Sequence, residues 1–547
     1  MPTWKPAAID KFIRFLPSGA GLVLLVAGLR STIQMMGQPL GPHDEGLLLT
    51  NANLVSQGLV PYRDFYSNYP PGIYLAIIGL WKLFGVSVTA ERALGFAAHG
   101  VLSLSAGWFA AYLAGSRFSL LAAGMVLLWL AWLGTVAFAW LVALAAALVT
   151  CVLLLRALES GSRSRWIAAG LALGGVGCIR HDLLIYFTSS LVAVAVAWRI
   201  GTRRWKLSRP ELTAVACLVL GAVVPLLAVW TPTLARSGVG QAVEDVYGVL
   251  VRDVMPARDL PMPPVLELRR TIPQPLTAPV FLIHSFEGAA ALTLVGPAVA
   301  LLWLLWAPRM GLRSRVGPAL LLALSVAVLP QMLGRTDAVH TLYTVTPCLI
   351  LLSALVEWLT RGRGLWSAAA ALAIAGIMYS PARTHVRFPD PGSPAAWQEA
   401  YPRYSRLPEV EAAREAVLAF IAESTDPGDP IFVGLSDHRR IYVGEMDLYY
   451  LADRPGATRI MQFDPNMVNR EDVQRQMAAE IEARGTKVAI LSSRFTDFSE
   501  PNESSTVGSS FLDDFLRAQF ETVEVAGPYQ LLRRRDPGPA RRVGSGP

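Results

Sequence analysis

Three short groups of ionisable side chains stand at the ends of long apolar runs. They are His43-Asp44-Glu45, Arg180-His181-Asp182, and the trio Arg335, Asp337 and His340 within "LGRTDAVH". A positioned carboxylate can take a proton from a reacting hydroxyl, and a guanidinium can bind phosphate oxygens through two hydrogen bonds. Ionisable groups at membrane depth are costly and tend to mark functional sites. Each group alone could also be an interfacial ion pair or a helix cap.

A longer polar stretch surrounds the first group, "GPHDEGLLLTNANLVSQGLVPYRDFYSNYPPG" at 41–72. The mixed apolar and amide residues of 45–59 predict an amphipathic helix lying in the membrane interface. Asp44 and Glu45 stand where acids stabilise a helix start, which we expect near Gly46. The polar and aromatic residues that follow are Tyr62, Arg63, Asp64, Tyr66 and Tyr69. Its tyrosines fit either a belt at the lipid headgroups or a binding surface.

The elements that must hold these groups are apolar helices. The chain of 547 residues is 53% hydrophobic and only 16% charged, and its mean hydropathy is +0.42. Runs of about 20 apolar residues predict membrane-spanning helices. We expect spans near 15–36, 70–86, 93–114, 118–133, 135–156, 166–180, 182–198, 211–231, 286–307, 316–333, 341–360 and 365–381.

The basic residues indicate how these spans are oriented. The net charge is +7, and Lys and Arg gather at the N-terminus and in short loops at 156–165, 199–209, 309–315 and 361–363. This is the pattern of cytoplasmic loops, so it argues for topology and against a nucleic-acid partner. It predicts a cytoplasmic N-terminus in an inner or plasma membrane and 11 or 13 crossings. Because the basic loop after residue 156 should be cytoplasmic, the segment 93–157 must cross the membrane an even number of times. One of the three apolar segments there should therefore be broken, re-entrant or split into two short helices.

The same count places several segments outside the membrane on the external face. The transmembrane domain is predicted at 1–381, with a first external loop at 37–70 and another at 232–285. A linker at 382–408 and a disordered tail at 536–547 flank a region of alternating helices and strands at 409–535. That alternation predicts an external, periplasmic or extracytoplasmic, α/β domain. The four cysteines, Cys151, Cys178, Cys217 and Cys348, lie in apolar runs and are expected to be buried.

The acid pair after the first span, the interfacial helix and "G.VPY.DF...YPPG" together resemble the GT-C class of polyprenol-dependent glycosyltransferases. Within this class, the chain most resembles the branch that contains the protein O-mannosyltransferases and the aminoarabinose–lipid A transferases. This branch is similar to glycosyltransferase family 39. The Arg-x-Asp-x-x-His spacing at 335–340 is similar to motifs of related bacterial members. The resemblance covers the layout of residues 1–380 and is most specific at 41–72.

The resemblance implies an enzyme that moves a sugar from a polyprenyl-phosphate carrier to a glycan, lipid or protein acceptor. The reaction would be a single displacement in which Asp44 acts as the general base, and Glu45 would orient Asp44 or contact the acceptor. The donor phosphate would be bound by Arg63, Arg180, Arg335 and His340. Expected substrate contacts are His43, Tyr62, Asp64, Tyr66, Tyr69, Asp182 and Asp337. No cofactor is expected: several of these groups could ligate a divalent metal, but no ligand-spacing motif is present.

One departure from the family pattern stands at Tyr69, where the aminoarabinose transferases often have a lysine, so phosphate binding must come from elsewhere. Two other functions remain open for such a chain. A transporter or flippase for lipid-linked precursors would share the many spans, but it would usually carry matched inverted repeats, which are not visible in the sequence. A non-catalytic partner in envelope glycan assembly would share the fold, but it would have no need of Asp44-Glu45.

Overall fold

The computed structural model divides into two compact units, which are described separately. The first, here the helical unit, comprises Met1–Gln38, Tyr69–Ala235 and Leu260–Ala396, and the second, the mixed unit, comprises Pro39–Asn68, Arg236–Asp259 and Trp397–Pro547. The residues that the structure describes are 6–203, 206–258, 260, 262, 286–306, 313–379, 408–440, 444–464, 466–494 and 508–535. The predicted linker before Pro408 and the predicted tail lie outside these residues.

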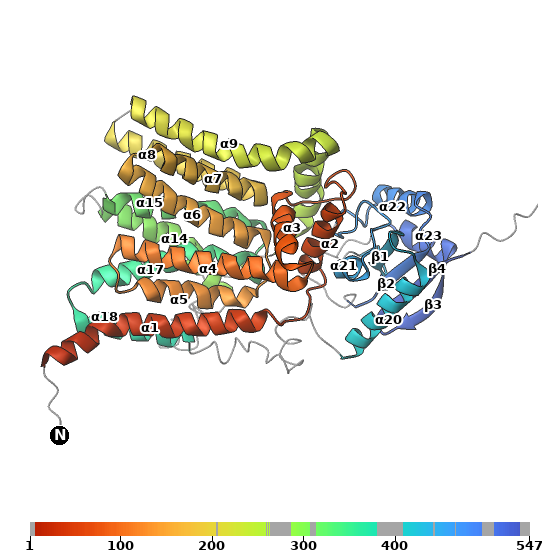
Figure 1. Cartoon of the computed structure of the whole chain (residues 1–547), viewed down its shortest axis with the longest axis horizontal. Coiled ribbons are helices and arrows are strands. Elements are labelled where there is room, and N and C mark those ends of the chain that lie inside the picture. Colours follow the sequence, from red (N-terminus) through yellow and green to blue (C-terminus); the bar gives the residue numbers. More distant parts are fainter. Residues whose placement is uncertain are drawn as a thin grey trace, which may run out of the picture. The chain divides into compact units, whose positions relative to one another are not determined.

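The helical unit is a bundle of apolar helices, most of which run side by side in Figure 1. Its helices are α1 (Pro6–Met35), α3 (Gly72–Phe84), α4 (Val88–Leu113), α5 (Ser119–Leu130), α6 (Ala139–Ser160), α7 (Arg163–Ile179), α8 (His181–Thr202), α9 (Arg209–Ser237), α14 (Phe286–Trp306), α15 (Arg313–Gly334), α16 (Ala338–Leu342), α17 (Thr346–Leu359) and α18 (Gly364–Tyr379). Among the described residues eight helices are long and apolar enough to cross a membrane, and three shorter apolar helices accompany them. The chain is therefore a multi-pass membrane protein, as predicted.

The 93–157 region contains one helix that is too short for a full crossing. The segment Ser119–Leu133, α5 with a final 3₁₀ turn, rises about 22 Å at 1.5 Å per residue. The hydrocarbon core is about 30 Å thick. Its neighbours α4 and α6 are full-length, so the irregular segment expected in this region is α5.

The core of the helical unit is largely apolar, and several of its buried polar side chains bond to backbone carbonyls. His99 of α4 is fully buried, with one ring nitrogen 2.8 Å from the Gly95 carbonyl and the other 3.0 Å from the Leu130 carbonyl. Such a histidine ties α4 to the end of α5 and is explained by packing. In contrast, leucines of α9 such as Leu220 and Leu227 are exposed, as expected for a helix facing lipid.

The mixed unit combines a small sheet with segments from the first loop and from the region after α9. Its elements are α2 (Asp44–Ser56), α10 (Val239–Val243), two π-helical turns (Glu244–Gly248 and Leu250–Val254), α11 (Met255–Arg258), α20 (Pro408–Ser424), β1 (Ile431–Leu435), α21 (Asp447–Ala452), α22 (Glu471–Ala483), β2 (Val488–Ser492), α23 (Phe511–Gln519), β3 (Phe520–Ala526) and β4 (Tyr529–Arg534). The strand order is β1-β2-β4-β3, with β1 and β2 parallel and the other pairs antiparallel. The alternation at 409–535 thus forms one sheet with helices, while α21 had no signal in the sequence.

Candidate functional site

The acid pair begins a helix in the mixed unit. Helix α2 starts at Asp44, two residues before Gly46, and both acids stand in its first turn. The buried Glu45 carboxylate accepts a 2.7 Å hydrogen bond from the Gly41 amide and closes the turn that precedes the helix. Asp44 and the preceding His43 are only half-buried. Of the two acids, Asp44 is thus the one more accessible to a substrate, and Glu45 shapes the turn.

The rest of α2 differs from the predicted amphipathic helix. Residues around nearly its whole circumference are buried, because its polar side chains meet protein. Thr50, for example, donates to the Met446 carbonyl at 2.7 Å, and Asn53 donates to Asp453 at 2.9 Å. Alternation alone could not show this, since an amide side chain suits a wet surface and a bonded interface equally well.

The tyrosine-rich turn after α2 is also built into the mixed unit. Tyr62 and Tyr66 are buried, and Tyr62 has φ 71°, in the left-handed region that costs a non-glycine residue free energy. Arg459 holds the turn, since its guanidinium donates to the Tyr62 carbonyl at 3.1 Å and its own carbonyl accepts from the Tyr66 amide at 2.8 Å. Asp245 pairs with the same guanidinium at 2.7 Å.

Arg63 and Asp64 form a local pair in this turn. The Arg63 guanidinium donates to both Asp64 oxygens at 2.8 Å. Asp64 also accepts from the Val60 amide at 2.7 Å. The bond from Arg63 lowers the pKa of the Asp64 carboxyl, against the opposing effect of partial burial. Because Arg63 is about half exposed, it is less pre-organised to bind a phosphate than an arginine that is more fully enclosed.

The helical unit gathers a second set of predicted residues around Arg180, which lies between α7 and α8. Its guanidinium makes a two-pronged ion pair with Asp182, one prong at 2.8 Å, and donates to Gln331 of α15 at 3.2 Å. The Gln331 amide donates in turn to Asp182. The guanidinium also lies over the ring of Tyr69, 5.7 Å from its centroid.

The approach of Tyr69 to Arg180 follows from a close contact between two helices. Gly72 starts α3 against the end of α7, where an added Cβ would overlap the Cys178 carbonyl. Only glycine allows backbones to approach so closely. The residue in the place of the family's lysine therefore contributes an aromatic face to the arginine.

The third predicted group lies between α15 and α16. Asp337 caps α16 by accepting from the His340 amide at 2.8 Å, and the same oxygen is 2.8 Å from the His340 ring. Its second oxygen accepts from Arg335 at 2.8 Å. The trio is thus a linked cluster around one carboxylate, and helix capping accounts for part of its pattern.

Tyr343 connects the second and third groups. It is fully buried, and it lies within electrostatic range of Arg180, Asp182 and Asp337. Its ring stacks on Trp140 at 3.8 Å between centroids. Its hydroxyl has no hydrogen-bond partner within the part of the chain that the structure describes. A buried hydroxyl of this kind is expected to bond to a ligand or an ordered water.

Sequence reasoning did not single out four of these residues. Gln331 interrupts an apolar run directly after Pro330, and that polar break was its one signal. Tyr343 stands three residues past His340, inside a predicted span. Asp245 and Arg459 are far apart in the chain, so only the folded structure reveals their pairing.

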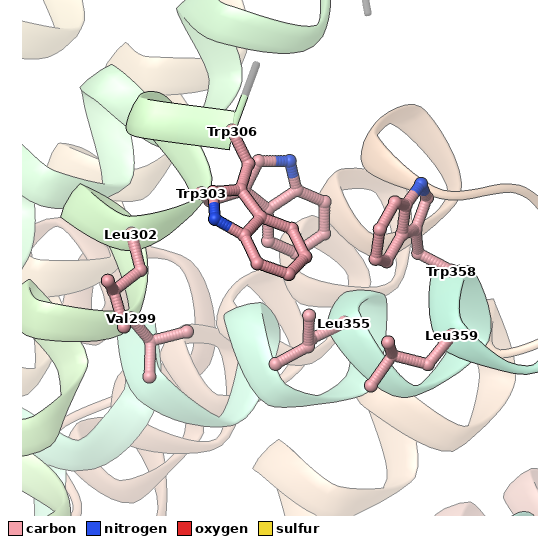
Figure 2. Close-up of a pocket in the computed structure, with 7 residues that line it drawn as sticks. All are labelled: Val299, Leu302, Trp303, Trp306, Leu355, Trp358 and Leu359. Carbon is pink, nitrogen blue, oxygen red and sulfur yellow. The ribbon is translucent and has the colours of Figure 1, made fainter. Parts of the chain in front are cut away.

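The helical unit also contains an apolar pocket of about 300 Å³ between α14 and α17. Figure 2 shows the side chains that line it: Val299, Leu302, Trp303, Trp306, Leu355, Trp358 and Leu359. None of them carries a charge or a hydroxyl. The pocket is therefore predominantly apolar and suits a hydrocarbon chain.

No protein-family model matches the chain, and no curated protein matches it. Among solved structures, the chain is similar over 93% of its length to 96% of ArnT from Cupriavidus metallidurans bound to undecaprenyl phosphate, with a TM-score of 0.55 and 15% identity. The same ArnT in the apo state gives a TM-score of 0.51 at 15% identity, with 93% of this chain and 96% of that chain covered. This likeness shows the fold, and it confirms the GT-C architecture that the residues at 41–72 predicted.

Proposed function

We propose that this protein is a glycosyltransferase that moves a sugar from a polyprenyl-phosphate carrier to an acceptor on the external face of the membrane. The observation that supports it most is the Arg180 cluster, in which a partly buried guanidinium lies within electrostatic range of Tyr343, whose hydroxyl has no hydrogen-bond partner among the described residues. A guanidinium that is oriented by an acid and lies near a hydroxyl donor is suited to bind an anion. In a membrane protein, the anion expected there is a lipid phosphate.

The fold supports the choice of carrier. ArnT, whose fold this chain shares, is bound to undecaprenyl phosphate in one of the two structures. The pocket between α14 and α17 adds an apolar surface that a hydrocarbon chain could use. The acceptor is a glycan, lipid or protein hydroxyl.

In the proposed reaction, the acceptor oxygen attacks the anomeric carbon of the sugar as the bond from that carbon to the phosphate oxygen breaks. The Asp44 carboxylate takes the acceptor's proton. The departing polyprenyl phosphate keeps the electron pair, and Arg180, with Arg335 and His340, stabilises its charge. A single displacement of this kind inverts the anomeric centre. Asp44 rather than Glu45 is proposed as the base because Asp44 is half-buried and accessible, whereas the Glu45 carboxylate is buried.

The test is turnover by purified protein in lipid, with polyprenyl-phosphate sugars as donors and cell-envelope extract as acceptor. Release of polyprenyl phosphate is expected, and Asp44→Asn should reduce it by about a hundredfold or more, the scale of a general base. Asp472→Asn is the matched control, since Asp472 is an exposed acid on α22 of the same unit. Equal rates for both variants would overturn the assignment of Asp44. Donor binding without any release would favour transport, and neither binding nor release would favour a non-catalytic role in assembly.

A further inference from the structure

Helix α2, which begins at Asp44, meets α21 of the α/β domain with almost no space between the two backbones. A Cβ added to Gly46 would overlap the Asp447 amide nitrogen and would lie 2.8 Å from the Asp447 Cα. Real Cβ contacts are essentially never so short. Because Gly46 is two residues from Asp44, the position of α21 fixes the first turn of α2.

Hydrogen bonds along the whole length of α2 support the same contact. The Asp447 amide donates to the Pro42 carbonyl at 3.1 Å, just before the acid pair. Thr50 donates to the Met446 carbonyl at 2.7 Å in the middle of the helix. At its far end, the Asn53 and Gln57 amides donate to one oxygen of Asp453 at 2.9 and 3.0 Å. These bonds fix both the angle and the register of α2.

Helix α21 is itself anchored to the sheet by buried charges. Asp447 is fully buried and pairs with Arg414 of α20. Glu445, just before α21, is buried and accepts from the Ser492 hydroxyl of β2 and the Tyr529 hydroxyl of β4, each at 3.1 Å. Breaking a buried pair is strongly destabilising because it leaves an uncompensated charge. The segment that contacts α2 is therefore held firmly.

We propose that the α/β domain is a positioning element for the reaction, with α21 holding α2 so that the Asp44 carboxylate is aimed at the acceptor. This inference rests on the proposed function. Asp447, Gly46 and Thr50 are positioning residues, since they act through Asp44 and touch no substrate. A base displaced by about 1 Å can cost a hundredfold in rate, so loss of this contact should act on kcat.

A matched pair of variants at Thr50 tests the proposal without disturbing the packing. Thr50→Val keeps the shape but removes the hydroxyl, and Thr50→Ser keeps the hydroxyl. We expect Thr50→Val to lower kcat about tenfold, the equivalent of one lost buried hydrogen bond, with donor KM changed less than about twofold. Thr50→Ser should remain near the wild-type rate.

Gly46→Ala is the stronger perturbation, with Gly79→Ala as its control. Gly79 lies on the exposed side of α3, and an added Cβ there meets no atom of the described residues within 4 Å. Gly46→Ala should lower kcat by about a hundredfold, and Gly79→Ala should leave it unchanged. Of these four variants, only Gly46→Ala and Thr50→Val should increase the hydrogen-exchange rate of residues 41–47.

These readouts separate the inference from the proposed function. If wild-type protein turns over no donor, the proposed function fails, but faster exchange at 41–47 in Thr50→Val still supports fixation of the acid pair by α21. Unchanged exchange and unchanged kcat in both Thr50→Val and Gly46→Ala would overturn the inference. A rise in donor KM with constant kcat would also overturn it, because that result assigns the contact to binding.

Discussion

Arg180 differs from the other predicted phosphate ligands in how completely its surroundings orient it. Asp182 and Gln331 hold its guanidinium from one side, and the Tyr69 ring lies against it. Arg63, by comparison, is about half exposed and pairs with the next residue. An arginine that is held in this way is pre-organised, so less side-chain entropy is lost when it binds an anion.

Arg180→Lys should therefore be far more harmful than Arg63→Lys. Lysine keeps the charge but cannot reproduce the two-pronged contact with Asp182. We expect turnover to fall about tenfold to a hundredfold, the equivalent of one or more charge-assisted hydrogen bonds. Arg63→Lys should change turnover less than about threefold, as for most exposed pairs. Initial rates with both variants in lipid measure this, and a similar loss in the two would contradict the ranking.

Tyr343→Phe separates binding from stability. Its hydroxyl is buried without a hydrogen-bond partner within the described residues, so removing it should leave the melting temperature unchanged or slightly higher. If the hydroxyl binds the donor phosphate, the donor KM should rise about tenfold. Thermal unfolding in detergent and steady-state kinetics give the two values. A lower melting temperature with constant KM would show that the hydroxyl has a structural role.

Residues of the candidate site could be singled out from the sequence where polar residues interrupt an apolar pattern. Asp44, Arg180 and Asp337 stood out in this way because charge beside an apolar run has a cost. Gln331 and Tyr343 did not, since an amide or a tyrosine at the end of a span is common. Arg459 could not be found at all, because its partners at Tyr62 and Asp245 are distant in sequence.

At the scale of elements, α21 shows why contacts between segments escape prediction. It has only six residues, Asp447–Ala452, and nothing in its local pattern indicates its role. Helices such as α22 were predictable because their apolar residues repeat at helical spacing and Gly485 follows the end of the helix. What α21 does depends on Arg414 and on Gly46, which lie in other segments.

The buried acid of α21 makes this element sensitive to pH. Burial raises the pKa of Asp447 to about 7, and the Glu445 carboxylate adds to this effect while Arg414 and Arg494 oppose it. The unfolded value is about 3.9. The folded state therefore holds the Asp447 proton more tightly than the unfolded state does. The stability that this protonation contributes is full below about pH 4 and is lost as the pH rises through about 7.

Hydrogen-exchange protection of 446–453, corrected for the intrinsic rate, should therefore fall between about pH 5 and pH 8. Asp447→Asn imitates the neutral acid, so it should flatten this dependence. Helix α22 provides the internal control within the same sample. An unchanged pH dependence in the Asn variant would mean that another group is responsible.

At the scale of the whole molecule, the hydropathy pattern predicted the membrane-spanning helices, and the distribution of charge predicted their orientation. Most helices of the helical unit fall within about five residues of the predicted spans, because lipid requires every backbone group to be bonded within its own helix. Helix α1 starts nine residues earlier than predicted, and α9 ends six residues later. The start of α2 and the short α5 were harder to predict, since neither forms a full span. The grouping of Pro39–Asn68 with the α/β domain had no signal in the sequence, since hydropathy does not report which polar segments pack together.

Topology is the remaining property of the whole molecule that the charge pattern predicts. Ser164 lies exposed in the first turn of α7, among the basic residues that follow α6, and Ala479 lies exposed on α22. The positive-inside rule places the first in the cytoplasm, and the count of crossings places the second outside. The native cysteines offer little background, since Cys151, Cys178 and Cys348 are buried and Cys217 is half-buried.

A membrane-impermeant thiol reagent applied to intact spheroplasts should label Ala479→Cys and spare Ser164→Cys until the membrane is permeabilised. Because Asp44 belongs to the same compact unit as Ala479, the result also reports the side on which the proposed base lies. Labelling of Ser164→Cys alone would place Asp44 in the cytoplasm, where the proposed external acceptor could not reach it. The predicted pattern would put the acid pair on the face where envelope acceptors are found.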